Sequence, residues 1–268
     1  MSDTPIIELK DVHVTFTTRT GSIFKPNKVH AVQGVNMKIM PGQTLGLVGE
    51  SGCGKSTTAN VMCGLQRPTS GKVFFKGQEV TKRSASDRRK IGKVVSVVFQ
   101  DPATALNARM VVRDQLEDPL IVNKIGSSKE RKERVHDLIH MVGLPFSSLD
   151  ALPGQLSGGQ RQRVAIARAL AIHPDAIIAD EPTSALDVSV RAQILNLLTD
   201  LKDQLGLAMV FISHDIQTVR YVSDRIAVMN GGKVVEEGPA AQLLANPQDA
   251  YTRTLLGAAP SLLHPQIN

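Results

Sequence analysis

The first part of the chain alternates apolar and polar residues with a period of two, the pattern of a β-strand with one buried face. Two such runs cover 7–16 and 35–39, and the apolar run TLGLVG follows the second of them as a buried strand. Between the two runs we expect an inserted polar loop over 17–30. The segment GKVFFKGQEV predicts a hairpin that turns at Lys76 and Gly77.

The later part of the chain alternates buried-strand patterns with helical periodicity. The elements expected here are a helix over 127–142, a helix over 161–172, a strand over 176–179, a helix over 190–205 closed by Gly206, a strand over 207–213 and a hairpin around Asn230 and Gly231. Strand–helix alternation after an initial group of β elements predicts an α/β core with an antiparallel edge and a helical insert.

The composition, with 42% hydrophobic and 21% charged residues, is an ordinary globular mixture with no sign of disorder. The longest apolar run, Leu207 to Ile212, is far shorter than the ~20 residues that span a bilayer. The start, MSDTPIIELK, lacks the basic and apolar regions of a secretory signal. We therefore expect a cytosolic protein whose membrane role, if it has one, depends on a partner.

The net charge of +6, from 31 basic and 25 acidic residues, is compatible with a nucleic-acid partner. Aromatic residues are only 3% and Trp is absent, so platforms for base stacking are scarce. An anionic membrane surface or an acidic protein face explains the charge equally well, and we expect no nucleic-acid partner. Cys53 and Cys63 have no metal-binding spacing and are expected to be reduced thiols.

A glycine-rich segment, GESGCGKST, matches the phosphate-binding pattern G-x-x-x-x-G-K-[ST] between an expected strand and an expected helix. Glycines let successive N–H groups curl around phosphate oxygens, and the helix N-terminus adds partial positive charge. The pattern also arises by chance in on the order of one chain in a hundred, and its strand–loop–helix context lowers that rate. The cofactor-binding candidates are Gly49, Glu50, Ser51, Gly52, Cys53, Gly54, Lys55, Ser56 and Thr57.

A phosphate loop also needs a carboxylate for Mg²⁺, expected at the end of a neighbouring apolar strand. The run AIIADE supplies Asp180 for this role, with Ser56 as a second metal ligand. Because side chains alternate along a strand, Glu181 is expected to point elsewhere and to act as general base on the attacking water. A helix-capping acid pair is the alternative, but Pro182 follows and no helical pattern begins there.

A second glycine-rich helix start lies in LSGGQRQRVAIARAL. Ser157, Gly158, Gly159 and Gln160 could present helix N–H groups to another anion, or Ser157 could serve only as an N-cap. One nucleotide seldom needs two γ-phosphate sites. The pair is explained if two subunits face each other and each contributes this helix to the other's ATP.

The ordered set GESGCGKST, Gln100, LSGGQ, IIADEP, SALD and ISHD resembles the ATP-binding subunits of ABC transporters over essentially the whole chain. The resemblance implies an α/β fold with a P-loop NTPase (RecA-like) core, an N-terminal antiparallel β subdomain and an inserted α-helical subdomain. It implies one ATPase domain over 1–268, divided into about 1–100 with 160–238, about 101–159, and a C-terminal extension over 239–268.

The same resemblance implies roles for individual residues. Phe16 would stack on adenine, Gln100 would touch the metal or the attacking water, and His214 would contact the γ-phosphate. Residues 157–160 would bind the ATP of the opposite subunit, and 184–187 would line the interface between subunits. Glu181, His214 and Gln100 are thus the catalytic candidates, and ATP and Mg²⁺ are the expected cofactors.

Three longer sequence segments resemble those of the dipeptide/oligopeptide importer group, in particular those of the second, F-type member of its paired ATPases. The segments that carry this resemblance are FQDPATALNARM, DEPTSALDVSVRAQILNLL and NPQDAYTRTLLGAAPSL. The implied partners are two transmembrane permease subunits, a second ABC ATPase (a paralogue or a second copy) and, indirectly, an extracytoplasmic solute-binding protein. The protein would lie at the cytoplasmic face of the membrane. The alternatives are the ATPase of an ABC exporter and a non-transport ABC ATPase.

Overall fold

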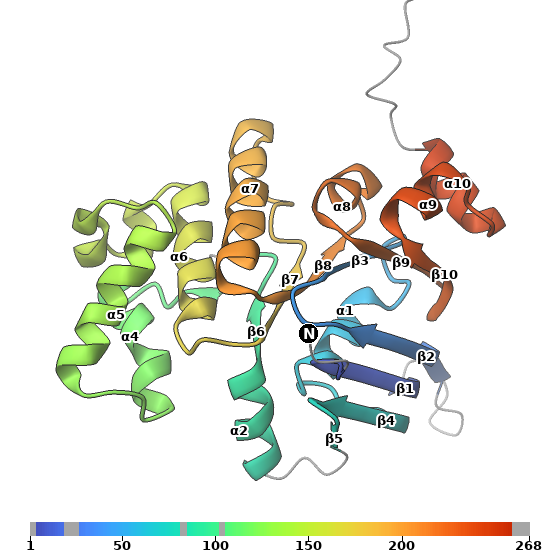
Figure 1. Ribbon diagram of the computed structural model, residues 1–268, viewed down its shortest axis with the longest axis horizontal. Helices are drawn as coiled ribbons and strands as arrows, with labels where there is room; N and C mark the ends of the chain where they lie inside the picture. The colour runs from blue at the N-terminus through green and yellow to red at the C-terminus, as the bar shows by residue number, and fades with distance from the viewer. Residues whose placement is uncertain (1–3, 19–26, 81–84, 102–104, 259–268) are drawn as a thin grey trace, which may run out of the picture.

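The structure, a computed structural model, describes residues 4–18, 27–80, 85–101 and 105–258. Two β-sheets form its centre (Figure 1). The antiparallel sheet has the order β2-β1-β4-β5, with β1 Ile7–Thr18, β2 Asn27–Ile39, β4 Ser70–Phe75 and β5 Gln78–Glu79. The second sheet has the order β10-β9-β3-β8-β7-β6, with β3 Thr44–Val48, β6 Val95–Val98, β7 Ala176–Asp180, β8 Ala208–Ser213, β9 Arg225–Asn230 and β10 Lys233–Pro239.

Helices surround the second sheet, whose strands are parallel except for β10. They are α1 Lys55–Met62, α2 Ala85–Val94, α4 Val112–Val122, α5 Ser128–Met141, α6 Gly158–Leu170, α7 Val188–Leu205, α8 Ile216–Val222, α9 Ala240–Ala245 and α10 Ala250–Ala258, with 3₁₀ turns η1 Phe146–Asp150 and η2 Pro153–Gln155. Figure 1 shows α4 and α5 as a helical lobe at one side of the sheet, next to α6. None of the described helices is long and apolar enough to cross a lipid bilayer.

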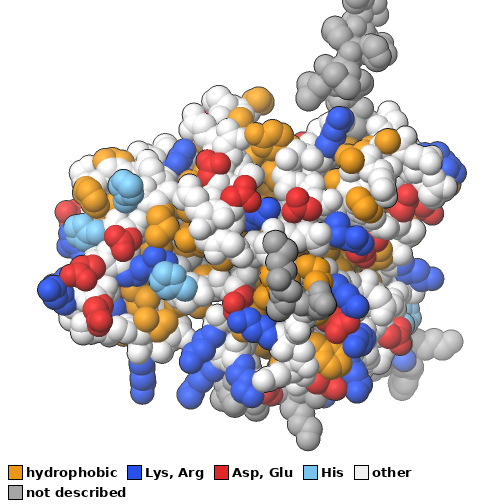
Figure 2. Space-filling model, in the orientation of Figure 1, with side chains coloured by type: hydrophobic (Ala, Val, Ile, Leu, Met, Phe, Trp, Pro, Cys, Tyr) orange, Lys and Arg blue, Asp and Glu red, His pale blue; other side chains and the backbone are white. Residues whose placement is uncertain are grey.

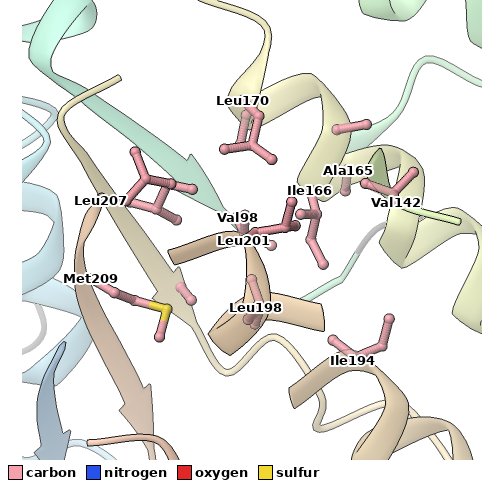
Figure 3. Close-up of a cluster of buried hydrophobic side chains, with 14 of the residues drawn as sticks. Val98, Val142, Ala165, Ile166, Leu170, Ile194, Leu198, Leu201, Leu207 and Met209 are labelled. Atoms are coloured by element: carbon pink, nitrogen blue, oxygen red, sulfur yellow. The ribbon is translucent and has the colours of Figure 1, made fainter. Parts of the chain in front are cut away.

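The parallel sheet separates two hydrophobic cores, because successive side chains of a strand point to opposite faces. On β8, Met209 and Phe211 belong to one core, whereas Val210 and Ile212 belong to the other. The first core continues through α6 and α7 into the helical lobe, as the side chains in Figure 3 show. The second core joins α1 to the antiparallel sheet. The helical lobe and the sheet therefore share one continuous core.

The surface is mixed in charge. Figure 2 shows Lys and Arg side chains beside Asp and Glu over one whole face, with hydrophobic side chains between them. Such interspersed charge is typical of a solvated surface.

The expected fold class is confirmed, and most differences concern the ends of elements. The hairpin turns at Lys76 and Gly77, both with left-handed φ (48° and 76°), as expected. The loop expected over 17–30 is too long at both ends, because β1 and β2 continue pairing as far as Thr18 with Asn27; residues 19–26 lie outside the described part.

Two other expectations need correction. The last hairpin turns one residue later than expected, at Gly231 and Gly232, because two successive left-handed residues are least strained when both are glycine. The helix expected to begin at residue 161 begins at Gly158, because Ser157 caps it. The helices α2, α4, α8, α9 and α10 were not among the elements expected from the residue pattern.

Candidate functional site

The loop between β3 and α1 is built from glycines in conformations that other residues adopt only under strain. Gly49, Gly52 and Gly54 have φ of 156°, 81° and 109°. Gly54 is the N-cap of α1 and has no side chain with which to satisfy the N–H groups of the first turn. Because of these N–H groups and the helix dipole, the start of α1 can bind an anion.

Lys55 lies folded over this loop. Its side chain is buried, and its ammonium donates hydrogen bonds to the carbonyls of Gly49 (2.7 Å) and Glu50 (2.9 Å). A buried cation is therefore held at the mouth of the phosphate loop by the backbone of the loop itself.

Neighbouring backbone presses closely on the loop. A Cβ atom at Gly49 would lie 2.2 Å from the carbonyl oxygen of Met229, and one at Gly54 would lie 2.3 Å from that of Ala31. The tip of the last hairpin also contributes, because Gly232 donates its N–H to the carbonyl of Cys53 at 2.9 Å. Segments from β2 and from the β9–β10 turn thus fix the shape of the loop.

Asp180 ends β7 and lies beside the start of α1. Burial raises the pKa of its carboxyl, and the charge of Glu181 adds to the rise, whereas a hydrogen bond from the Ser56 hydroxyl and the charge of Lys55 oppose it. The neighbour of β3 is β8 rather than β7, so Asp180 lies one strand further from the phosphate loop than the sequence reasoning assumed. Its contact with Ser56 nevertheless joins the two motifs.

Glu181 follows β7 in a left-handed conformation (φ 47°), which is costly for a residue with a Cβ atom. Three hydrogen bonds hold it there: its N–H donates to Ile212 O at 2.9 Å, and the N–H and hydroxyl of Ser184 donate to its carbonyl at 3.2 and 3.1 Å. This turn, rather than the alternation along a strand, separates its carboxylate from that of Asp180.

His214 follows β8 and faces Glu181. Its Nδ1 lies 3.1 Å from Glu181 Oε1, and its side chain is 57% exposed whereas that of Glu181 is only 17% exposed. The parallel strands β3, β7 and β8 therefore bring Lys55, Asp180, Glu181 and His214 to one edge of the sheet.

Side chains satisfy two of the backbone N–H groups at the second glycine-rich helix start. Ser157 is the N-cap of α6: its hydroxyl accepts the N–H of Gln160 at 3.2 Å, and the Gln160 side chain accepts the N–H of Ser157 at 2.8 Å. Gly158 and Gly159 have ordinary φ, and a Cβ atom at Gly159 would lie 2.6 Å from Val190 Cγ1. The start of α6 thus packs closely on the start of α7.

The segment 184–187 connects Glu181 to α7. Ser184 holds the carbonyl of Glu181, as described above, and Asp187 is the N-cap of α7, accepting the N–H of Val190 at 2.9 Å. This N–H bond and one from the Ser189 hydroxyl lower the pKa of the Asp187 carboxyl. The segment is therefore anchored at both of its ends.

Phe16 and Gln100 lie at the margins of this arrangement. Phe16 pairs with Val29 across β1 and β2, two residues along β2 from Ala31, whose carbonyl touches the phosphate loop; its side chain is 39% exposed. Gln100 is exposed just after β6, the edge strand of the sheet. Residues 102–104, which follow it in the FQDPATALNARM segment, lie outside the described residues.

Sequence reasoning missed one residue that touches the phosphate loop. Tyr251, on α10, accepts a hydrogen bond from the backbone N–H of Glu50 at 3.0 Å. The two residues are 201 positions apart, so no local pattern could pair them.

The Ser56–Asp180 pair has the chemistry of a Mg²⁺ site, because hydroxyl and carboxylate oxygens are hard ligands. Within the described part of the chain, no three His, Cys, Asp or Glu side chains form a metal-binding cluster. Mg²⁺ is commonly held by one or two protein ligands together with phosphate oxygens and water, so the residues present fit this ion.

Comparison with known proteins identifies the family to which this chain belongs. A model of the family described as ABC transporter matches residues 32–184, more than half of the chain. The chain belongs to the ABC transporter family. It is an ATPase of that family, as expected from the sequence.

Relatives place the chain within the family. It is 44% identical to the dipeptide transport ATP-binding protein DppF of Haemophilus influenzae, over 97% of this chain and 80% of the relative. It is 45% identical to the oligopeptide transport ATP-binding protein OppF of Lactococcus lactis, over 96% and 81%. The expected position among the F-type ATP-binding proteins, the group of DppF and OppF, is confirmed.

Solved structures agree with the fold. The chain is similar to the dimeric post-hydrolysis structure of the ATP-binding cassette MJ0796 bound to ADP and phosphate, with a TM-score of 0.77 and 33% identity over 87% of this chain and 98% of that one. It is also similar to cbiO1 of Clostridium perfringens, with a TM-score of 0.78 and 29% identity over 91% and 92%.

Proposed function

We propose that this chain hydrolyses ATP to drive the import of peptides or related small solutes, as a peripheral subunit at the cytoplasmic face of a membrane. The observation that carries the proposal is the convergence of Lys55, Asp180, Glu181 and His214 at one edge of the sheet, next to an uncapped helix start. The transport proteins to which the chain is similar support the choice of peptides as cargo.

Each residue has a distinct role in this proposal. The N–H groups of the phosphate loop and Lys55 would bind the β- and γ-phosphates. Glu181, held by its strained turn, would orient the attacking water and take up its proton, and His214 would contact the γ-phosphate. Ser56, Asp180 and Gln100 would hold Mg²⁺, which would supply positive charge to the phosphates.

The start of α6 would complete the ATP site of a second subunit. Its capping box orders residues 157–160 without a ligand, so the segment can be presented as a preformed surface. The dimeric structure of MJ0796 supports pairing of two cassettes. Phe16 would stack on adenine, and 184–187 would line the interface between the two subunits.

A groove between the sheet and the helical lobe fits a permease segment. Its cavity of ≈ 340 Å³ is lined mainly by apolar residues, among them Leu65 and Phe99, which are 54% and 45% exposed. Arg168 on α6 donates a hydrogen bond to the carbonyl of Ala105 at 2.7 Å, which ties the segment after Gln100 to the helix that carries residues 158–160. A permease segment in this groove would therefore contact both the segment after Gln100 and helix α6, which carries residues 158–160.

In this proposal, different parts of the chain bind nucleotide and contact the permease. The core and β subdomain (about 1–100 and 160–238) would bind nucleotide. The helical segment of about 101–159 would meet the permease, and 239–268 would form an extension.

Replacement of the proposed base tests the catalytic part. Glu181→Gln should still bind ATP but should hydrolyse it about 10²–10⁴-fold more slowly, and size-exclusion chromatography with ATP should show a trapped dimer. Glu133→Gln, an exposed change on α5, is the matched control and should turn over as the wild type does. Wild-type turnover by Glu181→Gln would remove Glu181 from this role.

Replacement in the groove tests the transport part. Phe99→Asp should abolish co-purification of permease subunits from membranes while ATP affinity stays unchanged. Val122→Asp, at a 71% exposed apolar position at the end of α4, is the control and should keep the permease. Retention of the permease by Phe99→Asp would exclude this groove as its docking site.

A further inference from the structure

The peptide unit between Gly49 and Glu50 is held from both sides. Its carbonyl, that of Gly49, accepts a hydrogen bond from the Lys55 ammonium at 2.7 Å. Its N–H, that of Glu50, donates to the hydroxyl of Tyr251 at 3.0 Å. Because the C=O and N–H of a trans peptide point in opposite directions, the two side chains fix the plane of this peptide. The first peptide of the phosphate loop is thus oriented by a residue from α10.

The start of α10 is itself anchored, so Tyr251 has a defined position. The Glu236 carboxylate on β10 accepts the N–H groups of Gln248 and Asp249 at 2.9 and 3.1 Å. The Asp249 carboxylate in turn accepts the N–H of Tyr251 at 2.8 Å. The partly buried ring of Tyr251 packs against the hydrophobic core, and its hydroxyl reaches the loop. The hydroxyl is preorganised rather than a mobile surface group.

The chemistry of this hydroxyl suits a neutral acceptor. Burial raises the pKa of Tyr251, and the N–H bond from Glu50 opposes that rise only in part. The phenol therefore stays protonated at neutral pH and offers its oxygen to Glu50 without adding a negative charge beside a site for phosphates.

We propose that Tyr251 is a positioning residue of the ATP site, through which the C-terminal segment 239–258 braces the phosphate loop. The inference rests on the proposed ATP site at this loop. When ATP binds, the Lys55 ammonium turns to the phosphates and releases the Gly49 carbonyl. Tyr251 then keeps the peptide in its binding orientation, so the hydroxyl contributes to ATP affinity rather than to the chemical step.

A pair of tyrosine variants tests the proposal, because the chain has two tyrosines and both hydroxyls form hydrogen bonds. Tyr251→Phe keeps the ring and removes the bond to the loop. Tyr221→Phe removes a bond to Asn196 Oδ1 (2.7 Å) on another part of the molecule and is the matched control. We expect Tyr251→Phe to raise the KM and Kd for ATP about three- to tenfold, the equivalent of one hydrogen bond, with kcat within about twofold of the wild type. Tyr221→Phe should leave all three unchanged.

Amide hydrogen exchange tests the hydrogen bond itself, and the change in KM at constant kcat separates its role in ATP binding from a purely structural one. Exchange at Glu50 should be faster in Tyr251→Phe than in the wild type, with the melting temperature close to that of Tyr221→Phe. Glu236→Gln, which weakens the anchor of α10, should shift ATP affinity in the same direction by a smaller factor and tests the brace without changing Tyr251.

Each outcome bears on a different claim. Equal ATP affinity and equal exchange at Glu50 in Tyr251→Phe and the wild type would overturn the inference while leaving the ATP site intact. A lowered melting temperature without a change in ATP affinity would also overturn it. Failure of the wild-type protein to bind ATP would instead remove the proposed site itself, and the inference with it.

Discussion

The helices α1 and α6 both begin at glycine-rich turns, yet the two starts are built differently. At α1 the N-cap is Gly54 in a left-handed conformation, which provides no side-chain acceptor for the first turn. At α6 the N-cap is Ser157 in an extended conformation, and its capping box with Gln160 satisfies N–H groups at both ends of the turn. At α1 no side chain caps the first turn, whereas at α6 the capping box satisfies the N–H groups of Ser157 and Gln160 but not those of Gly158 and Gly159.

The glycines also serve different purposes in the two turns. Gly49 and Gly54 are required by their φ and by backbone carbonyls of Met229 and Ala31 that leave no room for a Cβ atom. Gly159 has an ordinary φ, and the nearest obstacle to a Cβ atom there is the side chain of Val190. The same residue type therefore serves backbone conformation in one turn and helix packing in the other. Substitutions can separate these two requirements.

Removal of the phosphate-binding cation should have the largest effect. Lys55→Ala should weaken ATP binding on the order of a hundredfold, because charge-assisted bonds to phosphate oxygens are lost. Titration with a fluorescent nucleotide measures the change, with Lys72→Ala, an exposed lysine paired with Glu79, as the control. Unchanged ATP affinity in Lys55→Ala would mean that the open helix start does not bind phosphate.

A methyl group at the open start should be the next most damaging. Gly54→Ala should lower the free energy of unfolding by about 2–3 kcal/mol, because left-handed strain adds to overpacking against Ala31 O at 2.3 Å. Gly158→Ala should be tolerated, since its added Cβ would meet Leu186 at an ordinary 3.5 Å. Urea denaturation of both variants compares the two turns directly, and equal losses would remove the distinction between them.

The packing role of Gly159 predicts an intermediate effect that can be reversed. Gly159→Ala should cost about 1 kcal/mol through its approach to Val190. In the double variant Gly159→Ala/Val190→Ala, this cost should largely disappear, which a double-mutant cycle measures. Additive losses in the cycle would show that Val190 is not the group that excludes a side chain.

Loss of the side-chain cap should have a similar or smaller effect on stability. Ser157→Ala should lower the free energy of unfolding by about 1 kcal/mol, the usual cost of losing an N-cap. ATP affinity of the isolated chain should not change, because residues 157–160 are proposed to meet the ATP of a second subunit. A large loss of ATP affinity in this variant at concentrations where it is monomeric would contradict that assignment.

Local sequence patterns were sufficient to predict much of the candidate site. The phosphate loop is one continuous segment between a strand and a helix, and the runs that become β7 and β8 are apolar except for their last residues, Asp180 and Ser213. Because parallel strands end at the same edge of a sheet, Asp180, Glu181 and His214 could be expected there together. The strand order, with β8 next to β3, was not encoded in any local pattern.

What the sequence could not provide are features that depend on distant partners. The left-handed turn at Glu181 depends on bonds to Ile212 and Ser184, and only the folded sheet brings Ile212 there. The contact of Tyr251 with Glu50 joins residues 201 positions apart. The short helix α8, of seven residues, offers too few turns for a periodic pattern to be recognised.

The position of Gly232 has a practical consequence for protein engineering. The tip of an exposed two-strand hairpin is normally a preferred site for inserting a tag or a fluorescent domain. Here the N–H of Gly232 is bonded to Cys53, and its carbonyl accepts the N–H of Gln33 at 2.8 Å. An insertion at this tip would therefore change the phosphate loop itself, and a reporter domain placed there would be coupled to nucleotide binding rather than silent.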